Sequence, residues 1–474
     1  MKLPYRGNGK IYYKGKEYNC VLYYNEQEGG ILLKITVKNE NKTGDYLEVP
    51  LEMPYLCGQL DSGFKFTLLH LERNGMNELI SYGITEYNFY ADYILCGIGG
   101  EASQEQSFNK VSFNLSNIVA WGEESVYTIG KKYELIRKNE KSRKLIMNGS
   151  DFSISYWVSG SMLPVVEHDL LAEHIDLEQH GIFDIEFSTE QGLDKFLEIF
   201  DKLKRLIEIA VRIRLNLEKV EAYSSEIVYS IGDNTTIKRP IDVFGIGIKA
   251  ESAIERPTND YQWKWISFSD LIKYNSFELY FEKHEVLAPI VELYLEPMYI
   301  NASSNTRIFL NIIQALETYH SRFITNSLDR YKERVERIVN GRPNDEGRLK
   351  KFLLANSHKF ITLESRIADL LFAEGKVFFD TGDIEHIEFP AVIAHSRNYY
   401  IHYDETLKEK FKILSEEELQ IYNRALLQIL EFYILKELGF PIDTIDVMKK
   451  LNDRWGKISD DLNILNLSRS KYNS

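Results

Sequence analysis

The chain of 474 residues is 44% hydrophobic and 27% charged, a composition typical of folded proteins that excludes a disordered or collagen-like chain. At this length, two or more domains are expected. The formal net charge of −14 argues against a protein that coats nucleic acid without sequence preference.

The first residues and the cysteines bear on the cellular compartment. Lys2 and Arg6 are not followed by an apolar stretch, so no signal peptide is expected, and no apolar run approaches the length of a membrane span. Cys20, Cys57 and Cys96 lie far apart and form no CxxC pair. Buried thiols in a reducing compartment explain them better than disulfides or a metal site. The sequence therefore predicts a cytoplasmic protein with no membrane partner.

The acidic charge is unevenly distributed. From residue 306 onward there are 25 basic and 26 acidic residues, which leaves 32 basic and 45 acidic residues in the first 305. Residues 330–351 form a locally basic stretch with eight basic and four acidic side chains. RNA could therefore approach the C-terminal part, whereas much of the N-terminal part would repel it.

Up to about residue 187 the pattern predicts β-strands. Short alternating or aromatic-rich runs are bounded by Gly, Asn, Asp and charged turns. The clearest runs are residues 9–13, 20–24, 30–37, 65–71, 88–95 and 153–158. A helix is predicted over about residues 190–215, and strands again over 218–231 and 241–248.

From about residue 284 the pattern becomes helical. One apolar stripe marks a long helix over residues 306–339, which Gly341 and Pro343 stop. A second helix is predicted over about 362–372, and a third begins at Pro390, behind the acidic stretch 383–388.

Two further helices complete the predicted bundle. Ser415 and Glu418 form a capping box for a fourth helix, and Pro441 opens a short fifth one. The predicted fold class is therefore α+β and multidomain. We expect a β-rich N-terminal region, residues 1–275, to serve as sensor or regulator and to include the helix near 190–215, and an all-α bundle to follow over residues 276–474.

The predicted third helix carries a candidate catalytic motif. It reads Arg397-Asn398-Tyr399-Tyr400-Ile401-His402, with the Arg five positions before the His, as in the RxxxxH signature of HEPN nucleases. Asn398 directly follows the Arg, at the position where active members commonly carry a polar residue. The motif therefore predicts an all-α HEPN domain in the C-terminal part.

The layout resembles the ApeA-type proteins of bacterial anti-phage defence. The resemblance is carried by residues 314–320 (QALETYH) and 394–403 (AHSRNYYIHY), and it covers about the last 190 residues with specific signal. It implies a metal-independent, homodimeric endoribonuclease that acts when phage infects and halts host growth. It assigns catalysis to Arg397 and His402 and a supporting polar role to Asn398.

These residue types suit RNA cleavage by the 2′-hydroxyl. Histidine exchanges protons near neutral pH, and the planar, always charged fork of arginine matches phosphoryl oxygens. Five positions on an ideal helix turn about 140° past one full turn, so Arg397 and His402 lie on opposite flanks of an apolar stripe. Two such helices meeting across a twofold axis would bring both residue types into one cleft, which independently predicts a homodimer.

Other side chains are candidates for lesser roles. Glu317, His320, His395 and Tyr403 are possible supporting residues. Weaker RNA-binding candidates are Arg330, Arg334, Arg337, Tyr399 and Tyr400.

Structural alternatives stand beside each of these roles. Arg397 could simply bond to Asp404 or another acid, and Glu317 could pair with Arg322. His320 could be a hydrogen-bonded core or interface residue, and the tyrosines could be core or interface residues. No HExxH, GxSxG, DxD or zinc spacing occurs, so neither metal nor cofactor is predicted.

The functional prediction is an anti-phage endoribonuclease that cuts tRNA or another unpaired RNA loop. A phage-derived activator would release it from restraint by the acidic N-terminal region, and DNA is not an expected partner. Two alternatives stay open: a catalytically inactive HEPN dimer that binds RNA, nucleotide or protein, and a binding β-domain fused to a helical oligomerisation bundle. The second predicts that substituting Arg397 changes nothing functional.

Overall fold

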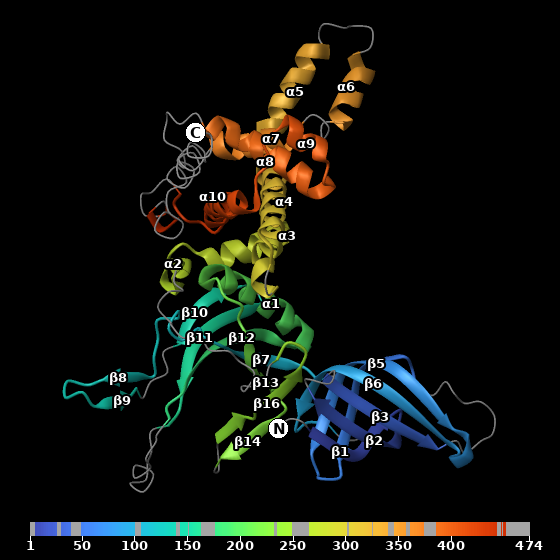
Figure 1. The fold of residues 1–474 in the computed structure, drawn as a ribbon. Helices are drawn as coiled ribbons and strands as arrows, with labels where there is room; N and C mark the ends of the chain where they lie inside the picture. Colours follow the sequence, from blue (N-terminus) through green and yellow to red (C-terminus); the bar gives the residue numbers. More distant parts are fainter. Residues whose placement is uncertain are drawn as a thin grey trace. The chain divides into compact units, whose positions relative to one another are not determined.

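The computed structural model describes residues 5–25, 30–38, 49–99, 106–138, 143–149, 151–162, 176–231, 235–248, 265–300, 303–324, 326–339, 346–356, 361–373, 385–442, 447 and 449–451. The chain divides into two compact units. The first contains residues 1–204 and 215–264, and the second contains residues 205–214 and 265–474. The first unit is β-rich and the second is helical, so the predicted fold class is confirmed (Figure 1).

Six strands of the first unit form a closed sheet. Each strand pairs antiparallel with its neighbours in the order β6-β3-β2-β1-β4-β5, and β5 pairs again with β6. The strands are β1 (Tyr5–Tyr13), β2 (Lys16–Asn25), β3 (Gly30–Lys38), β4 (Glu52–Leu60), β5 (Lys65–Leu79) and β6 (Ile84–Cys96). Closure leaves no unpaired edge along the ring, which removes a site for edge-to-edge aggregation.

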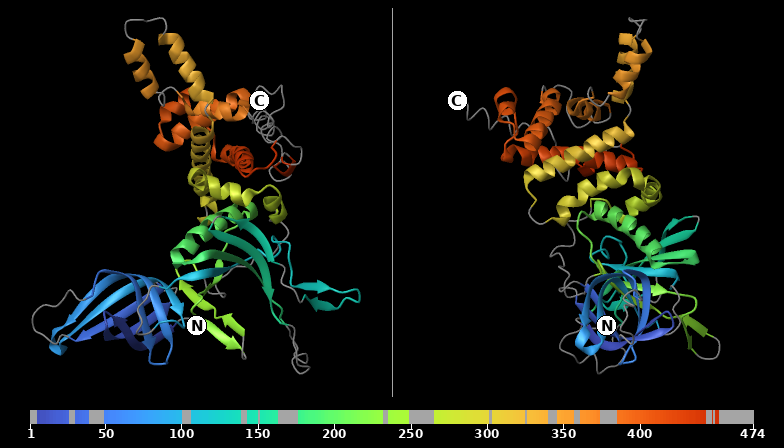
Figure 2. Two further views of the ribbon diagram at one scale, coloured as in Figure 1. Left: turned by 180° about the vertical axis from the view of Figure 1, so that it is seen from behind. Right: turned by 90° about the vertical axis from the view of Figure 1, so that its right-hand side faces the viewer.

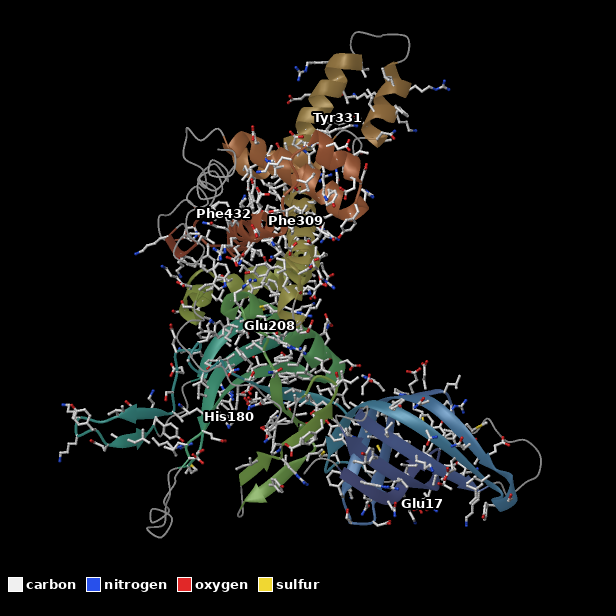
Figure 3. All side chains as sticks on the ribbon, viewed as in Figure 1. Glu17, His180, Glu208, Phe309, Tyr331 and Phe432 are labelled. Atoms are coloured by element: carbon white, nitrogen blue, oxygen red, sulfur yellow. The ribbon has the colours of Figure 1, made fainter. Side chains whose placement is uncertain are left out.

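Alternation along the chain explains the closed sheet. In β3, Ile31, Leu33 and Ile35 are buried and alternate with more exposed residues, as the period of two predicts. On the exposed side of the β1–β2 hairpin, Lys10 and Glu17 form an ion pair at 2.6 Å (Figure 3 labels Glu17). The predicted strands in this region are confirmed, and Cys20 and Cys57 are buried free thiols.

An open sheet continues from β6 in the order β16-β13-β7-β12-β11-β10. Its strands are β7 (Phe108–Leu115), β10 (Arg143–Asn148), β11 (Phe152–Gly160), β12 (Gln179–Gln191), β13 (Leu217–Tyr223) and β16 (Ile241–Gly245). Two small hairpins, β8 (Tyr127–Ile129) with β9 (Leu135–Arg137) and β14 (Val228–Ile231) with β15 (Thr235–Lys238), flank it.

Helix α1 (Leu193–Val211) covers one face of the open sheet (Figure 2). Phe200 stacks on Phe113 of β7 at 4.1 Å between ring centroids, and Phe196 packs edge-on against Phe187 of β12. The helix predicted over 190–215 is thus confirmed with shorter ends. The single strand predicted over 218–231 is wrong, because β13 ends at Tyr223 and β14 starts at Val228.

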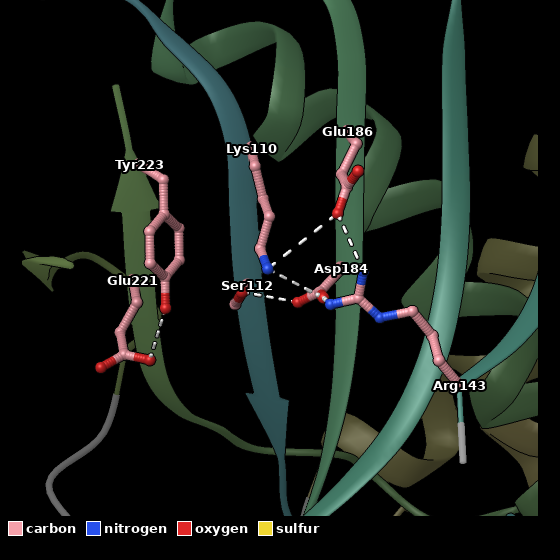
Figure 4. A network of polar contacts seen from close by, with 7 residues as sticks. All are labelled: Lys110, Ser112, Arg143, Asp184, Glu186, Glu221 and Tyr223. Atoms are coloured by element: carbon pink, nitrogen blue, oxygen red, sulfur yellow. Dashed lines mark hydrogen bonds and ion pairs between the residues drawn. The ribbon is translucent and has the colours of Figure 1, made fainter. Parts of the chain in front are cut away.

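The opposite face of the open sheet carries a charge network (Figure 4). Asp184 is fully buried and lies 2.6 Å from Arg143 and 3.1 Å from Lys110. Ser112 Oγ donates a further hydrogen bond to Asp184 at 2.6 Å, and Glu186 pairs with Arg143 at 3.2 Å. A buried carboxylate is tolerated only with such partners, so this network ties β7, β10 and β12 together.

The second unit is built of helices. In the described part of the chain they are α2 (Phe268–Lys273), α3 (Ser276–Tyr299), α4 (Asn305–Phe323), α5 (Asn326–Val339), α6 (Glu346–Ala355), α7 (Leu363–Ala373), α8 (Glu385–His402), α9 (Glu405–Lys410) and α10 (Glu416–Glu437). Helix α10 packs against α4, which also packs against α3. Helix α10 is buried on nearly all sides, as expected for a central helix.

Buried glutamates connect the central helices of this unit. Tyr294 of α3 donates a hydrogen bond to Glu431 of α10 at 2.6 Å, and Tyr319 of α4 donates one to Glu437 at 2.8 Å. Arg212, just after α1, lies over the ring of Tyr294 at 4.3 Å. These bonds satisfy acids that would otherwise be costly to bury.

Two helix predictions need correction. The single helix predicted over 306–339 is wrong, because α4 ends at Phe323 and Ile324 is extended at φ −115°, ψ 112°. The predicted single helix followed the apolar stripe across residues 324 and 325. Both residues are β-branched, a type that weakens a helix locally. The third helix starts at Glu385 rather than Pro390, so the proline lies inside it.

Other helices were not predicted from the sequence. Helix α6 lies in the stretch interpreted only as basic, and α3 begins before residue 284 and contains Pro289 and Pro297, which usually indicate helix ends. The capping box of Ser415 and Glu418 at the start of α10 is confirmed. The short helix predicted from Pro441 falls largely outside the described residues.

Candidate functional site

Helix α8 carries the RxxxxH motif and is fixed on its buried side. Phe389 stacks on Tyr422 of α10 at 5.3 Å. The buried Ser396 Oγ accepts a hydrogen bond from the backbone N–H of Leu414 at 3.0 Å, and the Tyr400 hydroxyl donates one to the Leu414 carbonyl at 2.7 Å. The helix therefore holds its remaining side chains in defined directions, a requirement for a preorganised site.

Arg397 is held from two directions. Its Nη2 lies 3.3 Å from Oε2 of Glu317 on α4, and its Nη1 donates to Oδ1 of Asn398 at 3.2 Å. The side chains of Arg397 and Glu317 are 32% and 27% exposed, so the Arg397 side chain is partly accessible to solvent. A guanidinium that neighbouring groups orient and that stays partly accessible is suited to binding a phosphoryl group.

The alternative that Arg397 bonds to an acid is observed, although its partner is Glu317 rather than Asp404. Asp404 caps α9 by accepting from the Thr406 N–H at 3.0 Å, and the hydrogen bonds from Thr406 hold the pKa of Asp404 below its ordinary value. Arg322 donates to the carbonyl oxygens of Glu285 and Val286 rather than pairing with Glu317. The acid beside Arg397 is Glu317.

His402 is the last residue of α8 and is exposed. Tyr403, which follows, adopts a left-handed backbone at φ 50°, the usual geometry just after a helix end. Ile401 and Tyr403 are 45% and 62% exposed. Because α8 continues to His402, the side chains of Arg397 and His402 project in directions about 140° apart.

The apolar stripe predicted between Arg397 and His402 consists of residues 392, 396, 399, 403 and 407, and it is only partly realised. Val392, Ser396 and Tyr399 are buried. Tyr403 and Leu407 are not on this helix, because α8 ends at His402 and Leu407 belongs to α9.

His320 lies inside the helical unit. It is 3% exposed, and its Nε2 is 3.0 Å from Oδ2 of Asp369 on α7. Arg366 Nη1 lies 3.4 Å from its Nδ1. Because arginine can only donate, Nδ1 accepts and Nε2–H donates to the carboxylate. His320 is therefore the hydrogen-bonded core residue that the structural alternative described. It lies one helical turn beyond Glu317 on α4.

The remaining motif side chains fix the surrounding segment. His395 stacks on Phe411 at 3.9 Å. The Tyr399 hydroxyl donates to Glu405 at 3.0 Å, and Lys408 lies 4.4 Å from the centre of its ring. Tyr399 is only 6% exposed, so its ring is not open to an unpaired base in this structure.

Tyr400 also packs inward. Phe309 of α4 (Figure 3) lies edge-on to its ring at 6.2 Å. Burial raises the pKa of Tyr400 above its ordinary value. Tyr403 is therefore the exposed ring among the three tyrosines of the motif.

The predicted RNA-binding arginines lie on α5. Arg337 is exposed, whereas the side chains of Arg330 and Arg334 are outside the described residues. Arg366 and Asp369 were not among the predicted candidates. Their spacing of three places them on one helix face, but only the fold shows that this face meets His320.

The described residues hold neither a metal-binding cluster nor a membrane-spanning helix. Within these ranges, no group of three or more His, Cys, Asp or Glu side chains is arranged to hold a metal ion. Likewise, no helix there is both long and apolar enough to cross a membrane.

A β-rich region followed by a helical unit with RxxxxH on a fixed helix defines the class of HEPN proteins with an added N-terminal region. Residues 310–444 match the family model described as Apea-like HEPN. Residues 5–272, more than half of the chain, match the model described as ApeA N-terminal domain 1. The chain belongs to the ApeA family of anti-phage defence HEPN proteins. No curated protein and no solved structure matches it.

Proposed function

We propose that this protein is a metal-independent endoribonuclease in which Arg397 and His402 carry out the chemistry. The proposal rests on how the Arg397 and His402 side chains are placed on α8. Glu317 and Asn398 orient Arg397, whose side chain is 32% exposed, and His402 stands exposed at the helix end. Family membership supports a nuclease class.

The proposed reaction uses the 2′-hydroxyl of the RNA as nucleophile. Its oxygen forms a bond to phosphorus as the bond from phosphorus to the 5′-oxygen breaks. One group takes the 2′ proton and another protonates the leaving 5′-oxygen, which is work suited to histidine. Arg397 would offset the charge that develops on the phosphoryl oxygens. The products are a 2′,3′-cyclic phosphate and a 5′-hydroxyl end.

The proposed active form is a homodimer through the HEPN unit. One helix directs Arg397 and His402 to different sides, so a single copy makes an incomplete site. A second copy related by a twofold axis would supply the complementary residues. The exposed side chains of Ile401 and Tyr403 beside His402 support an interface there.

We further propose an unpaired RNA loop as substrate, with the anticodon loop of tRNA favoured, because such loops present splayed nucleotides. A phage-derived component binding the β-rich region would relieve restraint on the nuclease. Full activity at native level in uninfected cells would contradict this part of the proposal.

The test is to express wild type and His402→Ala from a tightly controlled promoter, with and without phage, and to sequence RNA 5′ ends. We expect new 5′-hydroxyl ends only in infected wild-type cells. Identical RNA ends and identical protection in both strains would overturn the catalytic role and leave a binding HEPN dimer.

A further inference from the structure

Helices α5 and α6 form a hairpin at one end of the helical unit (Figures 1 and 2). The hydroxyl of Tyr331 on α5 (Figure 3) donates to the carbonyl of Leu353 on α6 at 2.9 Å. Glu336 and Lys350 form an ion pair between the helices, and Val335 and Val339 are buried. The hairpin is therefore internally packed and presents its other side chains outward.

The exposed charged side chains of the hairpin are basic in excess over the acidic Asp329 and Glu333. Lys332 and Arg337 on α5 and Arg348 and Lys351 on α6 are exposed. Lys332 pairs with Asp329 at 3.2 Å. Among the described residues, no ion pair includes any of the other three. Cations that form no ion pair within the protein are available to an external anion.

One face of α6 adds an aromatic ring to the cations. Phe352 is 61% exposed. It stands four positions after Arg348, and Lys351 stands three positions after Arg348, so Lys351 and Phe352 both lie beside Arg348 on one side of the helix. An exposed ring flanked by cations is the combination that binds single-stranded nucleic acid, because the cations contact phosphates while the ring stacks on a base.

We propose that the α5–α6 hairpin is the RNA-docking element of this protein. Lys332, Arg337, Arg348 and Lys351 contact phosphates of an RNA stem, and Phe352 stacks on an unpaired base. The chain as a whole carries −14, so a polyanion is drawn to the stretch where basic residues outnumber acidic ones two to one. This inference rests on the proposed function for the identity of the anion.

The test measures RNA binding separately from cleavage. Full-length protein with His402→Ala is titrated with a fluorescently labelled RNA stem–loop over a range of salt concentrations. The hairpin variant carries Lys332→Gln, Arg337→Gln, Arg348→Gln and Lys351→Gln. A matched control removes four exposed lysines of the β-rich unit: Lys65→Gln, Lys131→Gln, Lys132→Gln and Lys138→Gln.

We expect the hairpin variant to bind roughly 10- to 100-fold more weakly near 0.1 M salt, with the slope of log K against log salt reduced by about 2 to 3. Phe352→Ala should lower affinity for the loop about tenfold without changing that slope. The control variant should keep wild-type values. Equal loss in the control, or unchanged affinity in the hairpin variant, would overturn the proposal.

A second measurement separates this proposal from the nuclease proposal. In protein with His402 intact, the hairpin variant should raise KM for the stem–loop while kcat stays unchanged. If wild type cuts no RNA but the hairpin variant still loses RNA binding, the nuclease proposal fails and the docking element stands. If Phe352→Ala changes the oligomeric state and not RNA affinity, the ring is a protein contact and its stacking role is wrong.

Discussion

Arg397 shows how one acid on a neighbouring helix can orient an arginine side chain. An ion pair this exposed adds little to stability, at most about 1 kcal/mol. Its effect is on direction, because Glu317 on α4 fixes one edge of a fork that projects from α8. Glu317 is thus a positioning residue under the proposed mechanism rather than a catalytic one.

Substituting Glu317 tests this role. We expect Glu317→Ala to lower kcat about 10- to 100-fold by releasing the guanidinium from its orientation. Glu317→Gln should recover part of the loss, since the amide oxygen still accepts a hydrogen bond. The measurement is steady-state cleavage of the RNA stem–loop.

Gln314→Ala, at an exposed position one turn earlier on α4, is the matched control and should cleave like wild type. Wild-type kcat in Glu317→Ala, with Arg397→Ala inactive, would show that Arg397 needs no partner on α4.

At the scale of elements, the start of α10 is the clearest local determinant. The Ser415 hydroxyl accepts from the Glu418 N–H at 3.3 Å, and the Glu418 carboxylate accepts from the Ser415 N–H at 2.9 Å. Both bonds satisfy N–H groups that the helix leaves without partners. The capping box directly follows Leu414, the residue to whose backbone Tyr400 and Ser396 of α8 are hydrogen-bonded.

We therefore expect Ser415→Ala to lower the free energy of unfolding of the helical unit by about 1 kcal/mol. Urea unfolding followed by far-ultraviolet circular dichroism measures the change. Gln420→Ala, at an exposed position within the same helix, should unfold as wild type does. An unaltered midpoint in Ser415→Ala would mean that packing alone determines where α10 starts.

At the scale of the whole molecule, the dimer hypothesis has a direct complementation test. Arg397→Ala and His402→Ala homodimers should each lose at least about 100-fold in activity. Mixed subunits should regain measurable cleavage, because the mixed dimer contains one intact Arg and one intact His in the same cleft.

The control mixes each single variant with the double variant Arg397→Ala, His402→Ala, which cannot supply the missing residue and should stay inactive. Cleavage by a monomer, or failure of the single variants to complement each other, would contradict a shared cleft. The readout is the amount of new 5′-hydroxyl ends after mixing at subunit-exchange conditions.

The sequence by itself determined the β-rich and helical regions, the α10 capping box and the RxxxxH candidates. These features depend on short periods and local bonds that neighbouring residues specify. It could not locate the break at Ile324, since an apolar stripe continues across a helix end when both helices face one core. Prolines inside α3 and α8 indicated helix ends or starts, so the sequence did not predict the extent of α3 or the start of α8 at Glu385.

Only the tertiary structure decided which side chains meet. The Arg397–Glu317 pair and the His320–Asp369 pair join residues 80 and 49 positions apart. No local pattern specifies such pairs, because they form where α4, α7 and α8 pack together. The same packing buried His320 and Tyr399 while it left His402 and Tyr403 exposed, since burial depends on the distant helices that cover a face and not on the residue type alone.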